Sequence, residues 1–360
     1  MLRTSSLAGG GASIAQAVFL EDTQPIDVTI YGRRYLQSGY IEDDPTQFDT
    51  SIFTAKRPID SSIVTQSFGS SAIYGIAFGN GIYVAVGDDG KIATSPDGIA
   101  WTQQTPFSAN NLRDIAFGGG LFVAVGENGT VLSSPDGITW TARFGGFGTT
   151  LLLAARYLNG IFFVGGSAAL LATSPDGVNW TQQTTVSGTA NVNDFAYNGS
   201  LYAYVGSSQV LETSPDGVTW TARTSNATGL INTIASNGKL FVYGGNTGVA
   251  GFSSDGITWT RIFGAFSPDN ISDMTYSDDL FVAITSEPGI YYSHDGENWT
   301  ESTTVATSIQ RSVIINDGYI LSVGQDSGGN SEMVSYESLT FAGSTEAYAE
   351  NGENQYIRIT

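Results

Sequence analysis

Hydrophobic and polar residues alternate in short runs that are separated by glycine-rich turns over most of the chain. Residues 112–117 read LRDIAF and residues 121–126 read LFVAVG, with GGG between them, and TVLSS at 130–134 follows the turn sequence ENG. Alternation with a period of two predicts β-strands, and Asn-Gly predicts a tight hairpin turn. The segment therefore predicts three successive antiparallel strands, and WTAR at 140–143 predicts a fourth.

The same order of runs recurs along the chain, and each unit contains one copy of the sequence S-x-D-G-x-x-W. Six copies hold all six tryptophans, and successive tryptophans lie 39, 40, 40, 39 and 40 residues apart. A seventh, eroded copy is SYESLTF at 335–341, where Glu337 replaces the aspartate and Phe341 replaces the tryptophan. A period near 40 with four short strands per unit is typical of a β-propeller. The sequence thus predicts an all-β fold, a seven-bladed β-propeller over residues 61–360.

The residues of the repeated box suit a turn rather than a chemical site. An aspartate carboxylate accepts backbone N–H bonds within a turn, glycine adopts the positive φ that a tight turn needs, and an indole buries about 150–250 Å². We therefore predict that the boxes are structural. Their aspartates and tryptophans are Asp97 and Trp101, Asp136 and Trp140, Asp176 and Trp180, Asp216 and Trp220, Asp255 and Trp259, and Asp295 and Trp299.

The two ends of the predicted propeller are joined by a short sequence near its start. SIVTQSF at 62–68 is similar to WTQQT, the sequence that begins an outer strand at 101–105. We expect residues 62–68 to complete the last blade and close the ring. Residues 1–60 lack the periodic pattern of the propeller, and we interpret them as an extended N-terminal adaptor that attaches to another polypeptide.

Composition and charge exclude several kinds of partner and site. The net charge is −20, from 34 acidic and 14 basic residues, so we expect no nucleic acid partner. The chain has no cysteine and one histidine, His294, so we expect no metal site and no cofactor. The acidic turns at 87–90 and 125–129 lack the ligand density of a calcium loop. No run approaches 18 apolar residues, which predicts that no segment inserts into a membrane.

The box between the third and fourth strands of each unit resembles the Asp-box, or BNR, repeat of sialidases and related propellers. The resemblance implies a propeller fold and says little about activity, because Asp-boxes lie away from the active face of such propellers. A sialidase also needs a cluster of arginines. Here Arg143, Arg223 and Arg261 follow box tryptophans at matching positions, so they belong to outer strands of separate blades. We expect no sialidase activity and no enzyme.

Two alternative functions stay open. Asp114, Asp194 and Asp273 occupy equivalent positions on the predicted inner strands of the second, fourth and sixth blades, and two carboxylates on one face can serve a glycosidase. Their repetition in register instead predicts that each binds a neighbouring backbone group. A non-catalytic, protein-binding scaffold is the other alternative. Photosystem assembly factors use similar propellers, but that family carries a basic patch, and this chain has few basic residues.

The predicted ligand-binding face is the one opposite the boxes. Loops from an outer strand to the next inner strand share this face with the turns between second and third strands. These loops vary most among the units and carry aromatic and amide side chains that suit a glycan or a protein. The candidate ligand-binding residues are Phe107, Asn111, Arg113, Phe147, Asn193, Phe266 and Asn270.

Residues 35–51, YLQSGYIEDDPTQFDTS, resemble a motif of phage and prophage tail-fibre proteins that introduces a repeat or propeller module. The resemblance implies a virion structural protein, in a phage tail fibre or another surface appendage, with several copies in a particle. Residues 1–60 would contact other virion proteins, and the propeller would recognise a host-surface glycan or protein. The expected location is the virion, on the tail or the capsid surface. The bacterial surface or exterior is the second expectation.

Overall fold

The computed structural model describes the central part of the chain nearly continuously. The described residues are 71–266, 268–287, 289–302, 309–316, 319–326, 329 and 331–337, together with six short strands at 4–5, 17–18, 53–55, 64–66, 347–351 and 355–359. The chain divides into two compact units, one of residues Ser61–Ser338 and one of Met1–Asp60 with Leu339–Thr360. The structure thus groups residues 339–360 with the N-terminal unit, whereas the sequence analysis placed them in the propeller.

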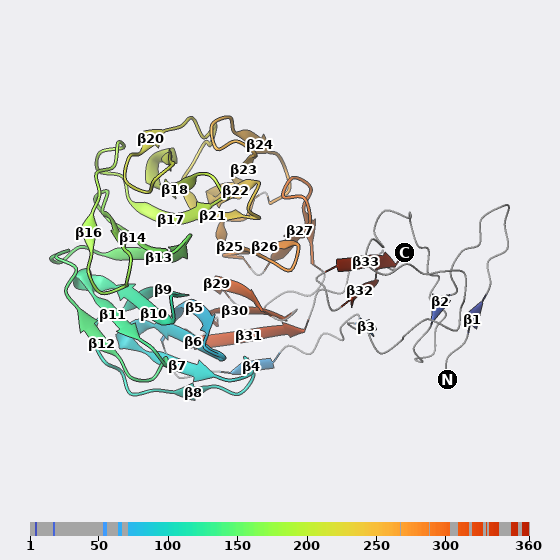
Figure 1. Ribbon diagram of the computed structural model, residues 1–360, viewed down its shortest axis with the longest axis horizontal. Helices are drawn as coiled ribbons and strands as arrows, with labels where there is room; N and C mark the ends of the chain where they lie inside the picture. Colours follow the sequence, from blue (N-terminus) through green and yellow to red (C-terminus); the bar gives the residue numbers. More distant parts are fainter. Residues whose placement is uncertain are drawn as a thin grey trace. The chain divides into compact units, whose positions relative to one another are not determined.

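In the larger unit, six blades are each built from one continuous stretch of chain and stand around a common centre (Figure 1). Four antiparallel strands follow one another in each blade, from the inner to the outer edge. The strands of the first three blades are β5 (Ile73–Gly79), β6 (Ile82–Gly87), β7 (Ile92–Ser95) and β8 (Thr102–Gln103); β9 (Leu112–Gly118), β10 (Leu121–Gly126), β11 (Val131–Ser134) and β12 (Thr141–Arg143); and β13 (Leu152–Leu158), β14 (Ile161–Gly166), β15 (Leu171–Ser174) and β16 (Thr181–Gln182).

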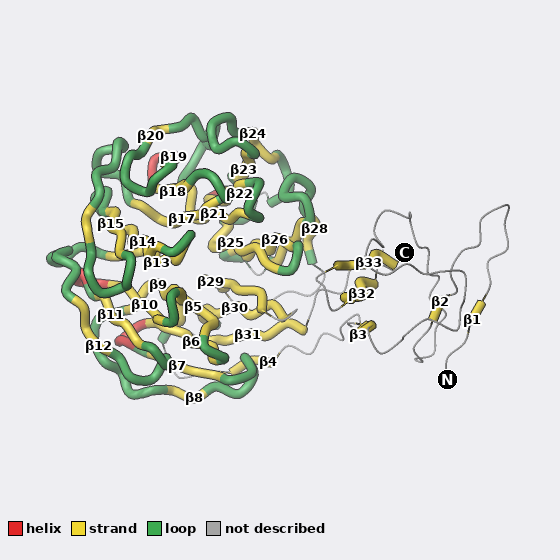
Figure 2. The backbone as a smooth tube through the Cα atoms, in the orientation of Figure 1, coloured by secondary structure: helices red, strands yellow, loops and turns green. Residues whose placement is uncertain are grey.

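The fourth to sixth blades repeat this order of four strands (Figure 2). Their strands are β17 (Val192–Tyr197), β18 (Tyr202–Gly206), β19 (Leu211–Ser214) and β20 (Thr221–Ala222); β21 (Ile231–Ser236), β22 (Phe241–Gly245), β23 (Ala250–Ser253) and β24 (Thr260–Ile262); and β25 (Ile271–Ser277), β26 (Leu280–Thr285), β27 (Ile290–Ser293) and β28 (Thr300–Glu301).

One further four-stranded sheet closes the ring and combines both ends of this unit. It consists of β29 (Ile309–Asn316), β30 (Tyr319–Gln325), β31 (Ser331–Glu337) and β4 (Val64–Gln66). β4 pairs antiparallel with β31, with Thr65 opposite Val334. β29 contacts the inner strands of both the sixth and the first blade. The expectation for residues 62–68 holds for 64–66, which form the fourth strand of this sheet.

The prediction of seven like blades, each built from an Asp-box repeat, is wrong: six blades are of this kind, and the composite sheet is not a seventh repeat. The eroded box explains the difference. Glu337 ends β31, and Ser338 stands where the six other copies have a glycine with positive φ, a conformation that glycine adopts more readily than serine. Among the described residues no fourth strand follows β31 in sequence, and β4 occupies that edge instead. The predicted adaptor lies outside the described residues, apart from short strands.

The smaller unit contains only short strands among its described residues. β1 (Thr4–Ser5) pairs with β2 (Ala17–Val18), and β3 (Phe53–Ala55) pairs with β32 (Ala347–Asn351), which pairs with β33 (Gln355–Ile359). The last of these sheets joins residues from near both ends of the chain.

In the first, second, fourth and fifth blades, the turn between the second and third strands is a short 3₁₀ turn: η3 (Asp88–Gly90), η4 (Glu127–Gly129), η5 (Ser207–Gln209) and η6 (Asn246–Gly248). In η4, the predicted Asn-Gly turn, Asn128 and Gly129 both have positive φ, 54° and 63°. A Cβ atom on Gly129 would lie 2.5 Å from the carbonyl oxygen of Gly148, so this position also needs glycine for space. The turn therefore holds the interblade loop tightly against it.

The hydrophobic cores lie between neighbouring blades. In one of them, Val84 and Ile92 of the first blade pack with Phe122 and Trp140 of the second, and all four side chains are buried. The box tryptophan thus covers the seam between its own blade and the preceding one. Because each sheet is buried against two neighbours, the fold needs no single central core.

Candidate functional site

The box turns use their own polar groups to form the turn. In the second blade, Asp136 Oδ1 accepts hydrogen bonds from the backbone N–H groups of Ile138 (2.9 Å) and Thr139 (2.6 Å). The Ser134 hydroxyl accepts one from the Gly137 N–H at 2.8 Å and donates to Asp136 at 2.9 Å. The described boxes of the other blades repeat this pattern. The carboxylate is thus engaged by the turn.

These hydrogen bonds make stability depend on pH. The N–H of Thr139 and then that of Ile138 hold the pKa of Asp136 at about 2, and equivalent bonds hold the pKa of Asp216 and Asp255 at about 2. A carboxylate with a lowered folded-state pKa stabilises the fold above its unfolded-state pKa, near 4, and this contribution is lost as the pH falls through 2.

We therefore expect the melting temperature to fall as the pH is lowered from about 4 to 2. Thermal unfolding followed by circular dichroism at half-unit pH steps checks this, and the decline should be smaller in Asp136→Asn, which cannot be protonated. An unchanged melting temperature over this window would contradict the role given to the box carboxylates.

The two faces of the propeller carry different loops, as predicted. On the box face, the Asn80 side chain in the first inner turn donates to the carbonyl oxygen of Pro135, in the box of the next blade, at 2.8 Å. On the other face, the Glu127 N–H in η4 donates to the carbonyl oxygen of Asn111, in an interblade loop, at 2.9 Å. The face with the interblade loops is called the loop face below.

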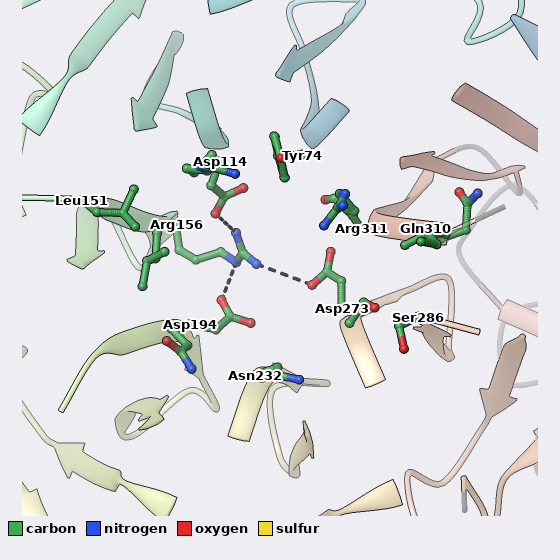
Figure 3. A pocket seen from close by; sticks show the side chains of 16 residues that line it. Tyr74, Asp114, Leu151, Arg156, Asp194, Asn232, Asp273, Ser286, Gln310 and Arg311 are labelled. Carbon is green, nitrogen blue, oxygen red and sulfur yellow. Dashed lines mark hydrogen bonds and ion pairs between the residues drawn. The ribbon is translucent and has the colours of Figure 1, made fainter. Parts of the chain in front are cut away.

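A cavity of about 500 Å³ lies at the centre of the ring, lined by the first residues of the inner strands and therefore on the loop face. Figure 3 shows its side chains converging from several blades. The lining residues are Tyr74, Arg113, Asp114, Leu151, Leu153, Arg156, Asn193, Asp194, Asn232, Ser272, Asp273, Ser286, Ile309, Gln310, Arg311 and Ser312.

One guanidinium group at the centre is shared by three carboxylates. Arg156, on β13, places Nη1 2.6 Å from Asp114, Nε 2.9 Å from Asp194 and Nη2 3.7 Å from Asp273 (Figure 3). The three aspartates come from the second, fourth and sixth blades, and each is at least nine-tenths buried. This group of four side chains is called the Arg156 cluster below.

The three aspartates follow one hydrogen-bonding pattern. One oxygen of each accepts the N–H of the next residue in its own strand, and the other accepts an N–H from the following inner strand. The donors are Ile115 and Ala155 for Asp114, Phe195 and Ile234 for Asp194, and Met274 and Val313 for Asp273, at 2.8–3.0 Å. The prediction that each repeated aspartate binds a neighbouring backbone group is confirmed, and these bonds tie inner strands together.

Burial changes the ionisation of the Arg156 cluster. It raises the pKa of Asp194 to about 6, against the attraction of Arg156 and with added repulsion from Asp273. Burial also raises the pKa of Asp114. Because the folded-state pKa of Asp194 lies above its unfolded-state value, the contribution of this group to stability is greatest below about pH 4 and is lost as the pH rises through 6.

The opposite edge of the cavity presents two arginines on one aromatic ring. The guanidinium carbons of Arg113 and Arg311 lie 4.3 and 4.8 Å from the ring centroid of Tyr74. Arg113 forms an ion pair with Glu127, and Arg311 donates to the side-chain oxygen of Gln325 at 3.4 Å. The two distances from guanidinium to ring are typical of cation–π contacts. Arg113, Tyr74 and Arg311 are called the arginine edge below.

The structure separates the candidate ligand-binding residues into four groups. Arg113 and Asn193 line the cavity, and the Asn193 side chain also donates to the carbonyl oxygen of Ile231 at 2.9 Å. Asn111 and Asn270 each accept a backbone N–H from a 3₁₀ turn at 2.8 Å. Phe107 is half exposed. Two others lie buried under their loops: Phe147 packs 6.2 Å from Trp180 and Phe266 packs 4.9 Å from Trp299, between ring centroids.

Sequence analysis did not assign Arg156, Tyr74 or Arg311 to a site. A signal for Arg156 does exist, because it occupies the inner-strand position held by Ala116 and Ala196 in the neighbouring blades. A charged residue at a position that is elsewhere small and buried indicates a partner of opposite charge. The repeated aspartates supply that partner.

Two kinds of feature are absent from the described residues. That part of the chain has no helix with the length and hydropathy needed to cross a membrane. It also has no group of three or more histidine, cysteine, aspartate or glutamate side chains placed to hold a metal ion.

Comparisons with known proteins identify the fold and leave the partner open. Residues 76–191 match the family described as the DUF6242 beta propeller domain. No curated protein matches the chain. The match covers about a third of the chain and lies within the propeller.

Solved structures of low sequence identity share the propeller fold. YCF48 from Cyanidioschyzon merolae is 16% identical with a TM-score of 0.60, and the alignment covers 77% of this chain and 98% of that one. A structure of YCF48 bound to D1 peptide is 15% identical, with a TM-score of 0.63 and coverage of 79% and 98%. The WD40 beta propeller domain of Doa1 is 11% identical, with a TM-score of 0.62 and coverage of 78% and 96%.

Proposed function

We propose that this chain is a non-catalytic propeller that binds a segment of another protein on its loop face. The observation that carries the proposal is the central cavity, a concave site of about 500 Å³ lined by both polar and apolar side chains. Ligand pockets in proteins typically have volumes of about 300–1,000 Å³. A propeller of the same fold in complex with a peptide, YCF48 bound to D1 peptide, supports this use of the fold.

The loops around the cavity expose apolar side chains to solvent. Phe144 is 93% exposed and Phe263 is 77% exposed, although each lies three residues before a buried phenylalanine of the same loop. Exposed aromatic side chains next to polar ones are typical of protein-binding surfaces. The other strongly exposed apolar residues in these loops or beside the cavity are Phe107, Val186, Leu230 and Ile309.

The carboxylates favour binding over glycoside hydrolysis. A glycosidase needs one carboxylic acid and one carboxylate that face the scissile bond. Here Asp114, Asp194 and Asp273 use both oxygens for backbone N–H groups and share Arg156, so they hold the inner strands together. The geometry therefore gives them a structural task at the floor of the cavity.

Attachment to a virion through residues 1–60 stays a prediction. Except for three short strands, this segment lies outside the described residues. A host-surface protein remains one of the partners that the loop face could bind. A virion location likewise stays a prediction.

Panning a random peptide library on the immobilised full chain tests the proposed function. We expect enriched peptides to lose at least tenfold in affinity for Ser286→Trp, because the indole fills the mouth of the cavity. Ser254→Trp is the matched control, since Ser254 is an exposed serine of a box on the opposite face. Fluorescence anisotropy measures both affinities. No enrichment, or peptides that bind both variants as well as the unmodified chain, would contradict the proposal.

A further inference from the structure

We infer that the cavity recognises its ligand through a carboxylate group held at the arginine edge, by Arg311 together with Arg113. This inference rests on the proposed function and adds the chemistry of the group that is bound. A carboxylate reaches such a site either as an acidic side chain or as the C-terminus of a peptide.

Arg311 carries a positive charge whose polar partner is neutral. Its guanidinium donates to the amide oxygen of Gln325, and the ion pairs of the described residues include none to Arg311. Its Nε is buried and has no hydrogen-bond acceptor within the described part of the chain. A guanidinium presents several N–H groups in a fixed fork that matches the two oxygens of a carboxylate. The charge of Arg311, which no described carboxylate pairs, therefore favours an anionic, planar ligand group.

Arg113 lies on the same ring and can share the ligand. Its guanidinium contacts the face of Tyr74, as that of Arg311 does, and its Nε is also buried without an acceptor among the described residues. Glu127 engages one end of this arginine. Tyr74 thus contacts two cations, and both positive charges add to the attraction for an anion at this edge of the cavity.

The carboxylates that line the cavity already accept hydrogen bonds from protein groups. The three aspartates of the Arg156 cluster accept six backbone N–H bonds between them and also contact Arg156. A cationic ligand group would have to compete with these donors, whereas an anionic one meets the charge of Arg311, which no described carboxylate pairs. The cavity is lined by three arginines and three aspartates. Their arrangement, and not their number, therefore decides whether the cavity binds a positive or a negative group.

The Arg156 cluster also links carboxylate binding to protons. Asp194 faces Arg156, Asp114, Asp273 and the hydroxyl of Thr233, and burial holds its pKa near 6. A second negative charge in the cavity favours the protonated form of Asp194. Carboxylate binding should therefore strengthen as the pH is lowered from 7 to 5.5, with uptake of protons.

Small probes test this inference on the full chain. N-acetylglycine carries a terminal carboxylate, N-acetylglutamate α-amide carries a side-chain carboxylate, and N-acetylglutamine α-amide is the neutral match. Inorganic phosphate is the fourth probe. Binding is followed by the arginine Nε–H signals in NMR spectra, which are assigned with Arg311→Gln and Arg113→Gln. Arg223→Gln is the control, because Arg223 directly follows the outer strand β20 and donates to the Thr213 hydroxyl.

We expect at least one carboxylate probe to shift the Arg311 signal to saturation, with at least tenfold weaker binding of the neutral amide. Arg311→Gln should lose this binding at least tenfold, and Arg223→Gln should keep it. The tighter of the two carboxylate probes identifies the source as a chain terminus or a side chain. Equal binding of the neutral amide, tenfold tighter binding of phosphate, or unchanged binding in Arg311→Gln would each overturn the inference.

The peptide library separates this failure from failure of the proposed function. If selected peptides have amidated ends, lack acidic residues and still lose affinity for Ser286→Trp, the loop face binds peptides and the carboxylate inference alone is wrong. If neither peptides nor carboxylates bind, both proposals fall.

Discussion

Replacing Arg156 by methionine is expected to lower the free energy of unfolding by about 3–5 kcal/mol, as is typical when one partner of a buried ion cluster is removed. Methionine keeps most of the length of the side chain and removes its charge. Asp114, Asp194 and Asp273 then lack their shared cation. Equilibrium unfolding in urea measures the change. The loss should also grow as the pH rises from 5 to 7, because more of the buried carboxylates are then charged.

Arg143→Met is the matched control for this loss. Arg143 belongs to the outer strand of the second blade, whereas the Arg156 cluster lies on inner strands. Its Nε donates to the Ser133 hydroxyl. A partly exposed hydrogen bond of this kind contributes about 1 kcal/mol. Adding Asp194→Asn to Arg156→Met should recover part of the stability. A loss below 1 kcal/mol in Arg156→Met would contradict the account of the cluster.

Replacing Trp140 by alanine is the second change expected to be large, at about 3–5 kcal/mol, the range for a buried aromatic side chain. Trp140 packs across the seam with the first blade, and its indole N–H donates to the carbonyl oxygen of Gly137 at 3.1 Å. Calorimetric melting measures the effect. The affinity of the folded variant for a selected peptide should stay within twofold of the unmodified value, since the box lies on the face away from the cavity.

Ile138→Ala is the control in the same box, because Ile138 is 54% exposed and its removal should change stability by no more than about 0.5 kcal/mol. The opposite pattern for Trp140→Ala, unchanged melting with loss of peptide binding, would show that the box recognises a ligand and is not structural.

The fold was predictable where its signal is local. The serine, aspartate and glycine of each box form hydrogen bonds within a few residues of one another, so their spacing revealed the strand order of six blades. The last sheet could be predicted only in part. The similarity of residues 62–68 to an outer strand indicated its closing strand. The eroded box at 335–341, in contrast, still resembles the other copies and therefore predicts a seventh repeat.

The site was harder to predict because its contacts join different blades. Arg156 and Asp114 are 42 residues apart, and the register of a repeat does not say which inner-strand side chains meet at the axis. The loops pose the same difficulty. Phe144 and Phe147 lie in one loop and look alike in sequence, yet one is 93% exposed and the other 7%, because Phe147 packs on Trp180 of the next blade.

Hydrogen–deuterium exchange of the full chain, with and without a peptide selected by panning, tests most directly whether the loop face is the binding surface. Binding is predicted to slow exchange in the interblade loops at 104–111 and 144–151 and at the start of β29, and to leave the box turn at 134–140 unchanged. Slowed exchange in the box turns, with unchanged exchange in the interblade loops, would place the binding surface on the box face and contradict the account.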